Sequence, residues 1–387
     1  WIIFLCLCLI SIIEVFSAAS TLTYKSGDHW GPITQHSIIL MVGAVVVVFL
    51  HNVPYKWFQV FPVFLYPISL VLLAFVTLMG IITGDRVNGA ARWMTFMGLQ
   101  FQPSELAKMA VIIAVSFILS KRQDEEGANP KAFKYIMILT GLVLLLIAPE
   151  NLSTAMLLFG VVFMMMFIGR VAAKKLLLLA GGLVLIVALG VGTVVAIPAK
   201  TLHNTPGLHR LETWQNRIKG FFDKDEVPAA KFDIDKDAQI AHARIAIATS
   251  HVVGKGPGNS IQRDFLSQAF SDFIFAIVIE EMGLIGGIFV VFLYLCLLMR
   301  AGRIAQKCER TFPAFLVMGI ALLLVSQAIL NMMVAVGLFP VTGQPLPLVS
   351  KGGTSTLINC AYIGMILSVS RYTAHLEEQK EHDAQLQ

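Results

Sequence analysis

Residues 254–287 read GKGPGNSIQRDFLSQAFSDFIFAIVIEEMGLIGG, a polar and glycine-rich stretch that becomes apolar at Phe273. The apolar run continues to residue 299, interrupted only by a pair of glutamates, and is long enough for a helix that crosses a bilayer. Asp272 stands at the mouth of this helix, where its carboxylate can meet an aqueous group on a lipid-borne substrate. The structural alternative is that Ser271 caps the helix and Asp272 is a first-turn acid.

The composition places the whole chain in a membrane. Of 387 residues, 57% are hydrophobic and 14% are charged, which excludes an ordinary soluble domain. The net charge of +5 is spread over short loops without interleaved aromatics, so no nucleic-acid partner is expected. The chain starts inside an apolar run at Trp1, and we expect further residues to precede it. Nucleotide-binding, zinc-protease and serine-nucleophile motifs are absent from the sequence in their proper context.

Hydropathy predicts an all-α polytopic membrane protein with ten transmembrane helices in one domain, 1–387. The expected spans are about 2–19, 35–51, 57–83, 104–120, 133–149, 152–169, 174–198, 272–299, 312–336 and 352–371. An even number of spans puts both chain ends on the same side of the membrane. The charged tail, 372–387, then follows the last span.

The short loops separate by charge into two sets. Twelve Lys or Arg residues fall in the loops that share a side with the tail, and four fall in the opposite short loops. Because cytoplasmic loops carry the excess of Lys and Arg, we expect both termini to be cytoplasmic and Asp272 to face outward.

One long hydrophilic segment, 199–271, separates the seventh and eighth spans on the outer side. Residues 208–222 have an apolar face at helical spacing and predict an interfacial amphipathic helix that contains Arg217. A second helix is expected at 238–250. The acidic stretch between them, 223–237, lacks the glycine and final glutamate of a calcium loop.

The outer loop 84–103 predicts a short hairpin followed directly by the fourth span. Arg92 lies beside Trp93 in this loop, as either a headgroup anchor or a pyrophosphate clamp. Glu105 and Lys108 are separated by three residues on the next helix, so they share a face and can pair. A lysine in an apolar span costs roughly 2.5–3.5 kcal/mol unless it is satisfied, so Lys108 is either functional or locked in that ion pair.

Glu280 and Glu281 interrupt the eighth span, about 12 to 13.5 Å beyond Asp272 along an unbroken helix. That distance separates them from the chemistry of Asp272. We expect them to hold polar contacts with Gln327 and Asn331 of the ninth span.

The last outer loop, GLFPVTGQPLPLVSKGGTS at 337–355, contains three prolines and four glycines, which prevents a continuous helix. Re-entrant backbone that lines a cavity is expected, because irregular backbone at membrane depth needs protein or water partners. Gly352 and Gly353 at a helix start, with Lys351 beside them, suit an anion. The alternative is an ordinary loop with a capped helix.

Four segments resemble the signature of the SEDS family (shape, elongation, division and sporulation). They are NGAARW…FQPSELAK, PENLSTA at 149–155, GNSIQ…SDFIFAIVIEEMGLIGG and LFPVTGQPLPLVSKGGTS. The similarity covers essentially the whole chain, and GNS followed by Gln262 and Arg263 resembles the division branch, FtsW, more than the elongation branch, RodA. The chain departs from the family at 267–271, where the usual Glu and His before the aspartate are missing, and at Lys351, which replaces an aromatic residue.

The resemblance implies that Asp272 is the catalytic residue, because it matches the aspartate of the family's TDFIF motif. Residue patterns and resemblance together give these candidate substrate-binding residues: Arg92, Glu105, Lys108, Arg217, Asn259, Ser260, Gln262, Asp264, Ser350, Lys351, Gly352 and Gly353. A divalent cation, Mg or Mn, is a candidate cofactor whose ligands the sequence does not identify.

The resemblance also implies the activity and the partners. We expect a glycosyltransferase that joins lipid II units into glycan at the division septum of the bacterial inner membrane, with Asp272 as general base. The expected partners are a class b penicillin-binding protein and other division proteins. A lipid II flippase and a non-enzymatic division scaffold are the alternatives.

A docking face for the single membrane helix of the transpeptidase is expected on the eighth and ninth spans. It would consist of large apolar residues and glycines that admit a close helix, namely Gly283, Gly286, Gly287, Phe289, Phe292, Tyr294, Phe315 and Leu316. The alternative is that these glycines pack internally.

Overall fold

The computed structural model describes most of the chain as helices. The described residues are 1–26, 31–82, 94–96, 99–124, 127–197, 215, 237–266 and 271–385. In chain order the elements are α1 (Ile2–Ser26), α2 (Gly31–Asn52), η1 (Tyr55–Gln59), α3 (Phe61–Ile82), β1 (Met94–Phe96), β2 (Leu99–Phe101), α4 (Pro103–Lys121), β3 (Gln123–Asp124), β4 (Gly127–Ala128), α5 (Pro130–Ile147), α6 (Leu152–Ile168), α7 (Ala173–Ala196), α10 (Asp237–Ala248), η3 (Gln262–Phe265), α11 (Ile274–Lys307), α12 (Thr311–Ala335) and α13 (Thr354–Gln385).

Nine of the ten predicted spans coincide with one helix each, and the eighth, 272–299, falls on α11, which is interrupted at Gly283; the all-α polytopic fold is thereby confirmed. Among the described residues, seven helices are long and apolar enough to cross a membrane, and α1 and α6 contribute shorter apolar stretches, Ile2–Ser17 and Leu152–Ile168. The exact number of ten crossings stays a prediction. The second helix expected in the long loop is present as α10.

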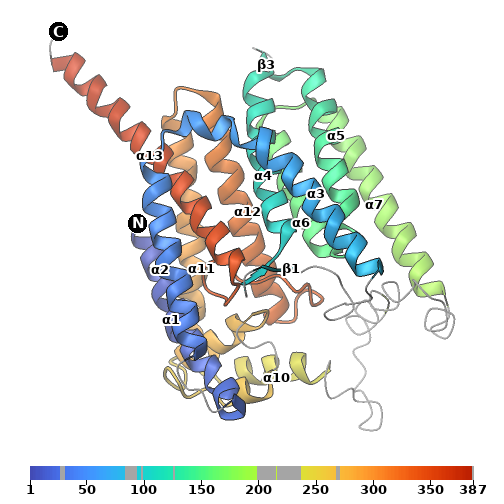
Figure 1. The fold of residues 1–387 in the computed structure, drawn as a ribbon, viewed down its shortest axis with the longest axis vertical. Coiled ribbons are helices and arrows are strands. Elements are labelled where there is room, and N and C mark those ends of the chain that lie inside the picture. The colour runs from blue at the N-terminus through green and yellow to red at the C-terminus, as the bar shows by residue number, and fades with distance from the viewer. Residues whose placement is uncertain are drawn as a thin grey trace.

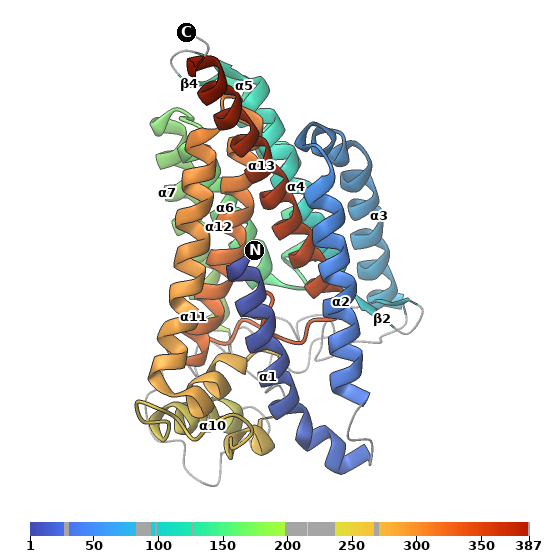
Figure 2. The ribbon, with the colours of Figure 1, turned by 90° about the vertical axis from the view of Figure 1, so that its left-hand side faces the viewer.

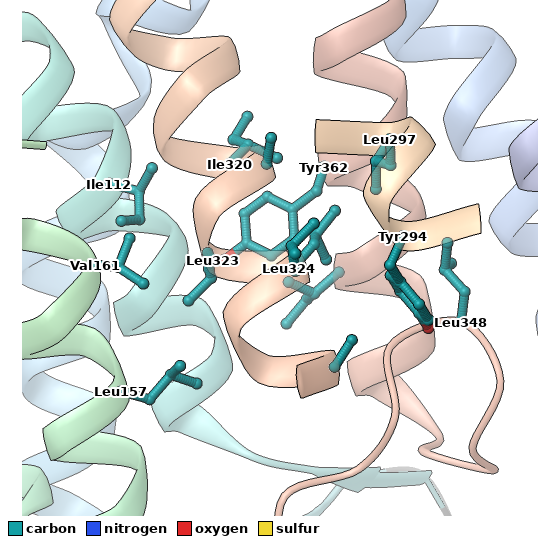
Figure 3. Close-up of a cluster of buried hydrophobic side chains, with 14 of the residues drawn as sticks. Ile112, Leu157, Val161, Tyr294, Leu297, Ile320, Leu323, Leu324, Leu348 and Tyr362 are labelled. Carbon is teal, nitrogen blue, oxygen red and sulfur yellow. The ribbon is translucent and has the colours of Figure 1, made fainter. Parts of the chain in front are cut away.

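The helices form one bundle with α4 and α12 inside it (Figure 1; Figure 2). Helix α12 packs against α4, α6, α11 and α13. Figure 3 shows the apolar side chains between these helices, with Tyr362 of α13 pointing toward Leu323 and Leu324 of α12. At the edge of the bundle, α7 leaves most of its apolar side chains exposed, as expected of a surface that faces lipid.

The two ends of the bundle differ (Figure 1). One end carries α10 and the β1–β2 hairpin, in which Met94 pairs with Phe101, so the hairpin predicted in loop 84–103 is confirmed. The other end carries β3 and β4, a small hairpin that the sequence did not predict, and the C-terminal part of α13. The short basic loops gather at this second end, as the charge pattern predicts.

Helix α13 continues through the charged tail to Gln385. Two ion pairs tie the tail to the turn between α11 and α12. Lys307 Nζ lies 2.7 Å from Glu377 Oε1, and Lys380 Nζ lies 2.9 Å from Glu309 Oε1. Because these pairs are exposed to solvent, each contributes little to stability.

Candidate active site

Asp272 lies just before α11 rather than in its first turn. The helix starts at Ile274 with Phe273 in the N-cap position, so the structural alternative, in which Ser271 caps the helix and Asp272 lies in its first turn, is wrong. The Ser271 hydroxyl instead donates to Asp272 Oδ1 at 2.9 Å. The Asp272 side chain is half-buried.

Two side chains from distant elements hold the main chain at Asp272. The side-chain amide of Asn331, on α12, donates to the Asp272 carbonyl at 3.0 Å and to the Gln344 carbonyl at 2.8 Å. The hydroxyl of Ser350 donates to the Ser271 carbonyl at 2.7 Å. Asn331 and Ser350 are 1% and 3% exposed, so the two donor side chains are themselves fixed by the surrounding protein and hold the backbone at the aspartate.

The helix that follows Asp272 is broken at Gly283. This glycine has φ 72° and ψ −175°, outside the helical region, and it divides α11 into Ile274–Met282 and Leu284–Lys307. Residues 273–281 are buried on every side. A Cβ at Gly287 would lie 3.7 Å from Phe275 Cζ, whereas twelve residues of continuous helix span about 18 Å. The first segment therefore folds back along the second.

The fold-back changes the expected place of Asp272 and the two glutamates. Glu280 and Glu281 lie at the break, and they bind the loop 254–263 instead of Gln327 and Asn331. The predicted contacts with the ninth span are wrong because they assumed an unbroken helix. Asp272 lies at the opposite end of the buried segment, against α12.

The break also alters the predicted docking face. Gly283, Gly286, Gly287, Tyr294 and Leu316 are buried. Their place on the face is a wrong prediction, and the alternative of internal packing holds for the glycines. Gly287 packs against Ile279. The exposed large apolar side chains of α11 are instead Leu284, Ile285, Ile288, Phe289, Val291, Phe292, Leu295 and Met299.

The extended segment 338–353 links α12 to α13 and contains one turn, at 347–350. Side chains bind several of its carbonyls. The Asn331 amide donates to the Gln344 carbonyl, as described above. Gln327 Nε2 donates to the Pro345 carbonyl at 3.0 Å. The Ser11 hydroxyl donates to the Val349 carbonyl at 2.8 Å. The Tyr294 hydroxyl donates to the Pro347 carbonyl, and Figure 3 shows it pointing at this segment beside Leu348. Irregular backbone is thus buried in protein, which is what its depth requires.

Lys351 follows this segment and precedes α13, together with Gly352 and Gly353. All three residues are half-buried. Burial lowers the pKa of the Lys351 ammonium below its usual value. The three residues share this region with Ser350, whose hydroxyl binds the chain next to Asp272.

The predicted ion pair on α4 is present and fully enclosed. Lys108 Nζ lies 2.7 Å from Glu105 Oε1 and donates to Gln327 Oε1 at 2.9 Å, and Lys108 is 0% exposed. Because Gln327 also binds Pro345, this pair connects to the extended segment. Contact between Lys108 and a pyrophosphate stays a prediction.

The remaining predicted residues on the loop 254–263 and η3 differ in exposure. Ser260 is buried, and Asn259 Nδ2 donates to the Lys255 carbonyl at 3.1 Å. Gln262 Oε1 lies 2.7 Å from Nδ1 of His242 on α10. Asp264 is 55% exposed and lies 3.6 Å from Arg263. Arg92 and Arg217 lie outside the described residues, as does the amphipathic helix at 208–222 apart from Gln215.

A small surface pocket lies between α3, α4, α5 and α6. Its lining includes the apolar residues Leu73, Val76 and Leu146 and the polar residues Gln102, Ser104, Glu150 and Asn151. Asn151 caps α6 by accepting from the Thr154 N–H at 3.2 Å. Thr154 in turn accepts a hydrogen bond of 2.7 Å from Gln344, which connects the pocket wall to the segment bound by Asn331.

Within the described part of the chain, no group of three or more His, Cys, Asp and Glu residues is placed to hold a metal ion. The ligands of a divalent cation therefore stay unidentified.

Comparison with known proteins places this architecture in a family. A family model described as "Cell cycle protein", covering FtsW, RodA and SpoVE, matches residues 1–375. A probable peptidoglycan glycosyltransferase FtsW from Trichlorobacter lovleyi is 33% identical over 93% of this chain and 89% of its own length. Another, from Halomonas elongata, is 30% identical over 97% of this chain and 91% of its own length.

Solved structures agree with this assignment. A chain in a peptidoglycan synthase complex that coordinates polymerization and crosslinking superposes with a TM-score of 0.69 at 25% identity, covering 94% of this chain and 96% of that one. The rod shape determining protein RodA of Thermus thermophilus has the same fold, with a TM-score of 0.64 at 24% identity over 96% of this chain and 95% of its own. Since the family model matches nearly the full length, the chain belongs to the FtsW, RodA and SpoVE family, the SEDS proteins.

Proposed function

We propose that the chain is a peptidoglycan glycosyltransferase that polymerises lipid II into glycan strands during cell division, with Asp272 as its general base. The family and the names of the FtsW relatives support the activity. The observation that carries the role of Asp272 is the fixed backbone around it, held by Asn331 and Ser350. A reacting group needs such fixed geometry, since a misplacement of about 1 Å can cost about a hundredfold in rate.

In the proposed reaction, the Asp272 carboxylate takes the proton from the acceptor sugar hydroxyl as its oxygen attacks the anomeric carbon of the donor. The bond from that carbon to the pyrophosphate breaks, and the lipid-linked pyrophosphate leaves with the electron pair. Lys351, half-buried and one residue from Ser350, is the described cation best placed to stabilise the leaving charge. Arg92 and Arg217 are further candidates for this role.

We further propose that the pocket between α3 and α6 contacts part of the lipid-borne substrate, because its lining combines apolar and polar side chains. A divalent cation, Mg or Mn, would supply further charge stabilisation to the pyrophosphate.

The orientation follows from the charge pattern. We place the end with the basic loops, β3 and the tail in the cytoplasm, and the end with α10 outside, in a multi-pass inner-membrane protein at the septum. For the partner, a class b penicillin-binding protein, we propose a docking site on the exposed face of α11 around Phe289 and Phe292. A related chain is part of a peptidoglycan synthase complex, which supports the existence of a partner and leaves the α11 face as our proposal.

The test is polymerisation of labelled lipid II by the purified protein with its cognate transpeptidase. Glycan strands are expected from the wild type and none from Asp272→Asn, which is nearly isosteric and should keep the melting temperature of the wild type. Near wild-type polymerisation by this variant would remove Asp272 as the base. Transfer of lipid II across a vesicle bilayer without polymerisation would favour the flippase.

A further inference from the structure

The break in α11 leaves main-chain groups without helical partners, and the loop 251–256 supplies them. On one side of the break, the N–H groups of Lys255 and Gly256 donate to the carbonyls of Glu280 and Glu281 at 3.0 and 2.8 Å. On the other side, the N–H groups of Leu284 and Ile285 donate to the carbonyls of residues 251 and 252 at 3.2 and 3.3 Å. The loop therefore caps both halves of the broken helix.

This close approach requires a glycine in the loop and a glycine at the helix break. Gly283 has φ +72° and Gly254 has φ +79°, which L side chains rarely adopt. A Cβ at Gly254 would collide with the main chain of Gly283, and a Cβ at Gly283 would collide with the Val252 carbonyl. The loop and the helix break are thus packed backbone to backbone.

The Glu280 carboxylate binds the next part of the loop, residues 255–262, through hydrogen bonds. It accepts hydrogen bonds from Lys255 Nζ at 2.6 Å, from the Ser260 hydroxyl at 2.5 Å, and from the N–H groups of Ile261 and Gln262 at 3.1 and 3.3 Å. The side chain of Glu280 is 0% exposed. Its two oxygens thus face donors only.

The Glu281 carboxylate binds an adjacent part of the loop and also a side chain of α1. It accepts from the N–H groups of Gly258 and Ser260 at 2.9 and 3.2 Å and from the Ser17 hydroxyl. Arg263 Nη1 lies 3.9 Å away and donates to Ser17 Oγ at 2.8 Å. Like its neighbour, Glu281 is 0% exposed.

We propose that Glu280 and Glu281 are positioning residues, which clamp the loop 254–263 onto the break in α11 and thereby fix the buried segment that carries Asp272. The segment from Phe273 to Met282 has Asp272 at one end and the clamp at the other. The Asn331 and Ser350 bonds hold the first end, and the two carboxylates hold the second. The catalytic part of this inference rests on the proposed role of Asp272.

Direct contact with substrate does not fit these two glutamates. Both are fully buried, and backbone N–H groups, hydroxyls and cations occupy their oxygens. A carboxylate that accepts several N–H bonds is a strong local anchor, and replacing it with an amide turns an NH2 group toward those donors. Glu280→Gln and Glu281→Gln therefore loosen the loop without changing side-chain size.

The first test measures deuterium exchange by mass spectrometry on the full-length protein. We expect either variant to raise exchange at Gly258, Ser260, Ile261 and Gln262 and in residues 272–282, compared with the wild type. Glu309→Gln is the matched control, because Glu309 also pairs with a lysine but lies at the other end of the bundle. Unchanged exchange in 258–262 in both glutamine variants would overturn the clamp, whatever Asp272 does.

The second test separates positioning from binding. A displaced base lowers kcat for lipid II polymerisation, by about tenfold to a hundredfold, and leaves KM nearly unchanged. A higher KM with normal kcat would overturn the positioning role and indicate substrate contact. If exchange rises in the glutamine variants but Asp272→Asn keeps full activity, the proposed base is refuted and the clamp stands. Failure of the clamp and failure of the proposed base are therefore distinguishable. Variants whose melting temperature falls are assayed well below it, where they remain folded.

Discussion

The side-chain amide of Asn331 bridges the Asp272 carbonyl, at 3.0 Å, and the Gln344 carbonyl, at 2.8 Å. One residue of α12 thereby joins the segment before α11 to the extended segment before α13. The Asn331 side chain and its bond to Gln344 are buried, and its bond to Asp272 is part-buried.

Asn331→Ala removes the NH2 group that donates both bonds, so the part-buried Asp272 carbonyl and the buried Gln344 carbonyl lose this partner. Each such loss costs roughly 1–3 kcal/mol, so we expect a lower melting temperature and a reduced kcat for polymerisation. Thr373→Ala is the control, because the Thr373 side chain is also buried and its hydroxyl bonds to the Ser370 carbonyl of its own helix at 2.9 Å. Equal kcat for Asn331→Ala and the control would show that the bridge does not set the geometry of Asp272.

Lys108→Met leaves the buried Glu105 carboxylate without its ion-pair partner. Breaking a buried pair costs roughly 3–5 kcal/mol, so a large fall in melting temperature is expected. The double variant Glu105→Gln with Lys108→Met should recover much of this stability, as measured by thermal unfolding in detergent. A normal melting temperature with weaker lipid II binding would instead assign Lys108 to the pyrophosphate.

The protonation of Lys351 predicts how KM for lipid II depends on pH, and burial of the ammonium determines the direction of the change. Burial lowers its pKa, so the ammonium is charged at low pH and loses its charge at a lower pH than an ordinary lysine. If it binds pyrophosphate, KM for lipid II rises as the pH increases through that lowered pKa, by about tenfold to a hundredfold for a lost charge-assisted bond. Lys351→Arg stays charged and should flatten the profile. An identical rise in Lys351→Arg would point to another group.

Phe289→Ala combined with Phe292→Ala removes two exposed aromatic side chains from α11, which are 42% and 53% exposed. We expect weaker co-purification of the transpeptidase and lower polymerisation in the complex, with unchanged activity of the isolated chain. The matched control is Leu185→Ala with Ile186→Ala on α7, where the side chains are 60% and 70% exposed. Full co-purification of the α11 variant would move the partner site to another face.

Hydropathy was sufficient to predict most of the fold. A membrane segment forms its backbone hydrogen bonds within one helix and carries mostly apolar side chains, so each span appears in the sequence as one apolar run. The ion pair between Glu105 and Lys108 was equally predictable, since it depends only on spacing within one helix. The prolines and glycines of 337–355 correctly predicted irregular backbone.

The break at Gly283 was not predictable in the same way. The sequence around it is as apolar as an unbroken span, and a glycine there fits close helix packing as well as a left-handed φ. Every error about Glu280, Glu281 and the glycine face followed from extending the helix through this point. The partners of these glutamates lie about 20 residues earlier, in a loop whose path hydropathy does not describe.

The extended segment 338–353 also constrains the order in which the protein assembles in the membrane. Its carbonyls take their donors from α1, α11 and α12, and Ser11 precedes Val349 by 338 positions. Pairing of this kind is non-local, so the segment can settle only after the earlier helices have come together. We therefore expect the placement of this segment and of α13 to be a late step of assembly. A chain terminated before residue 338 would lack the contacts that Gln344 and Ser350 make beside Asp272, even with all the preceding helices inserted.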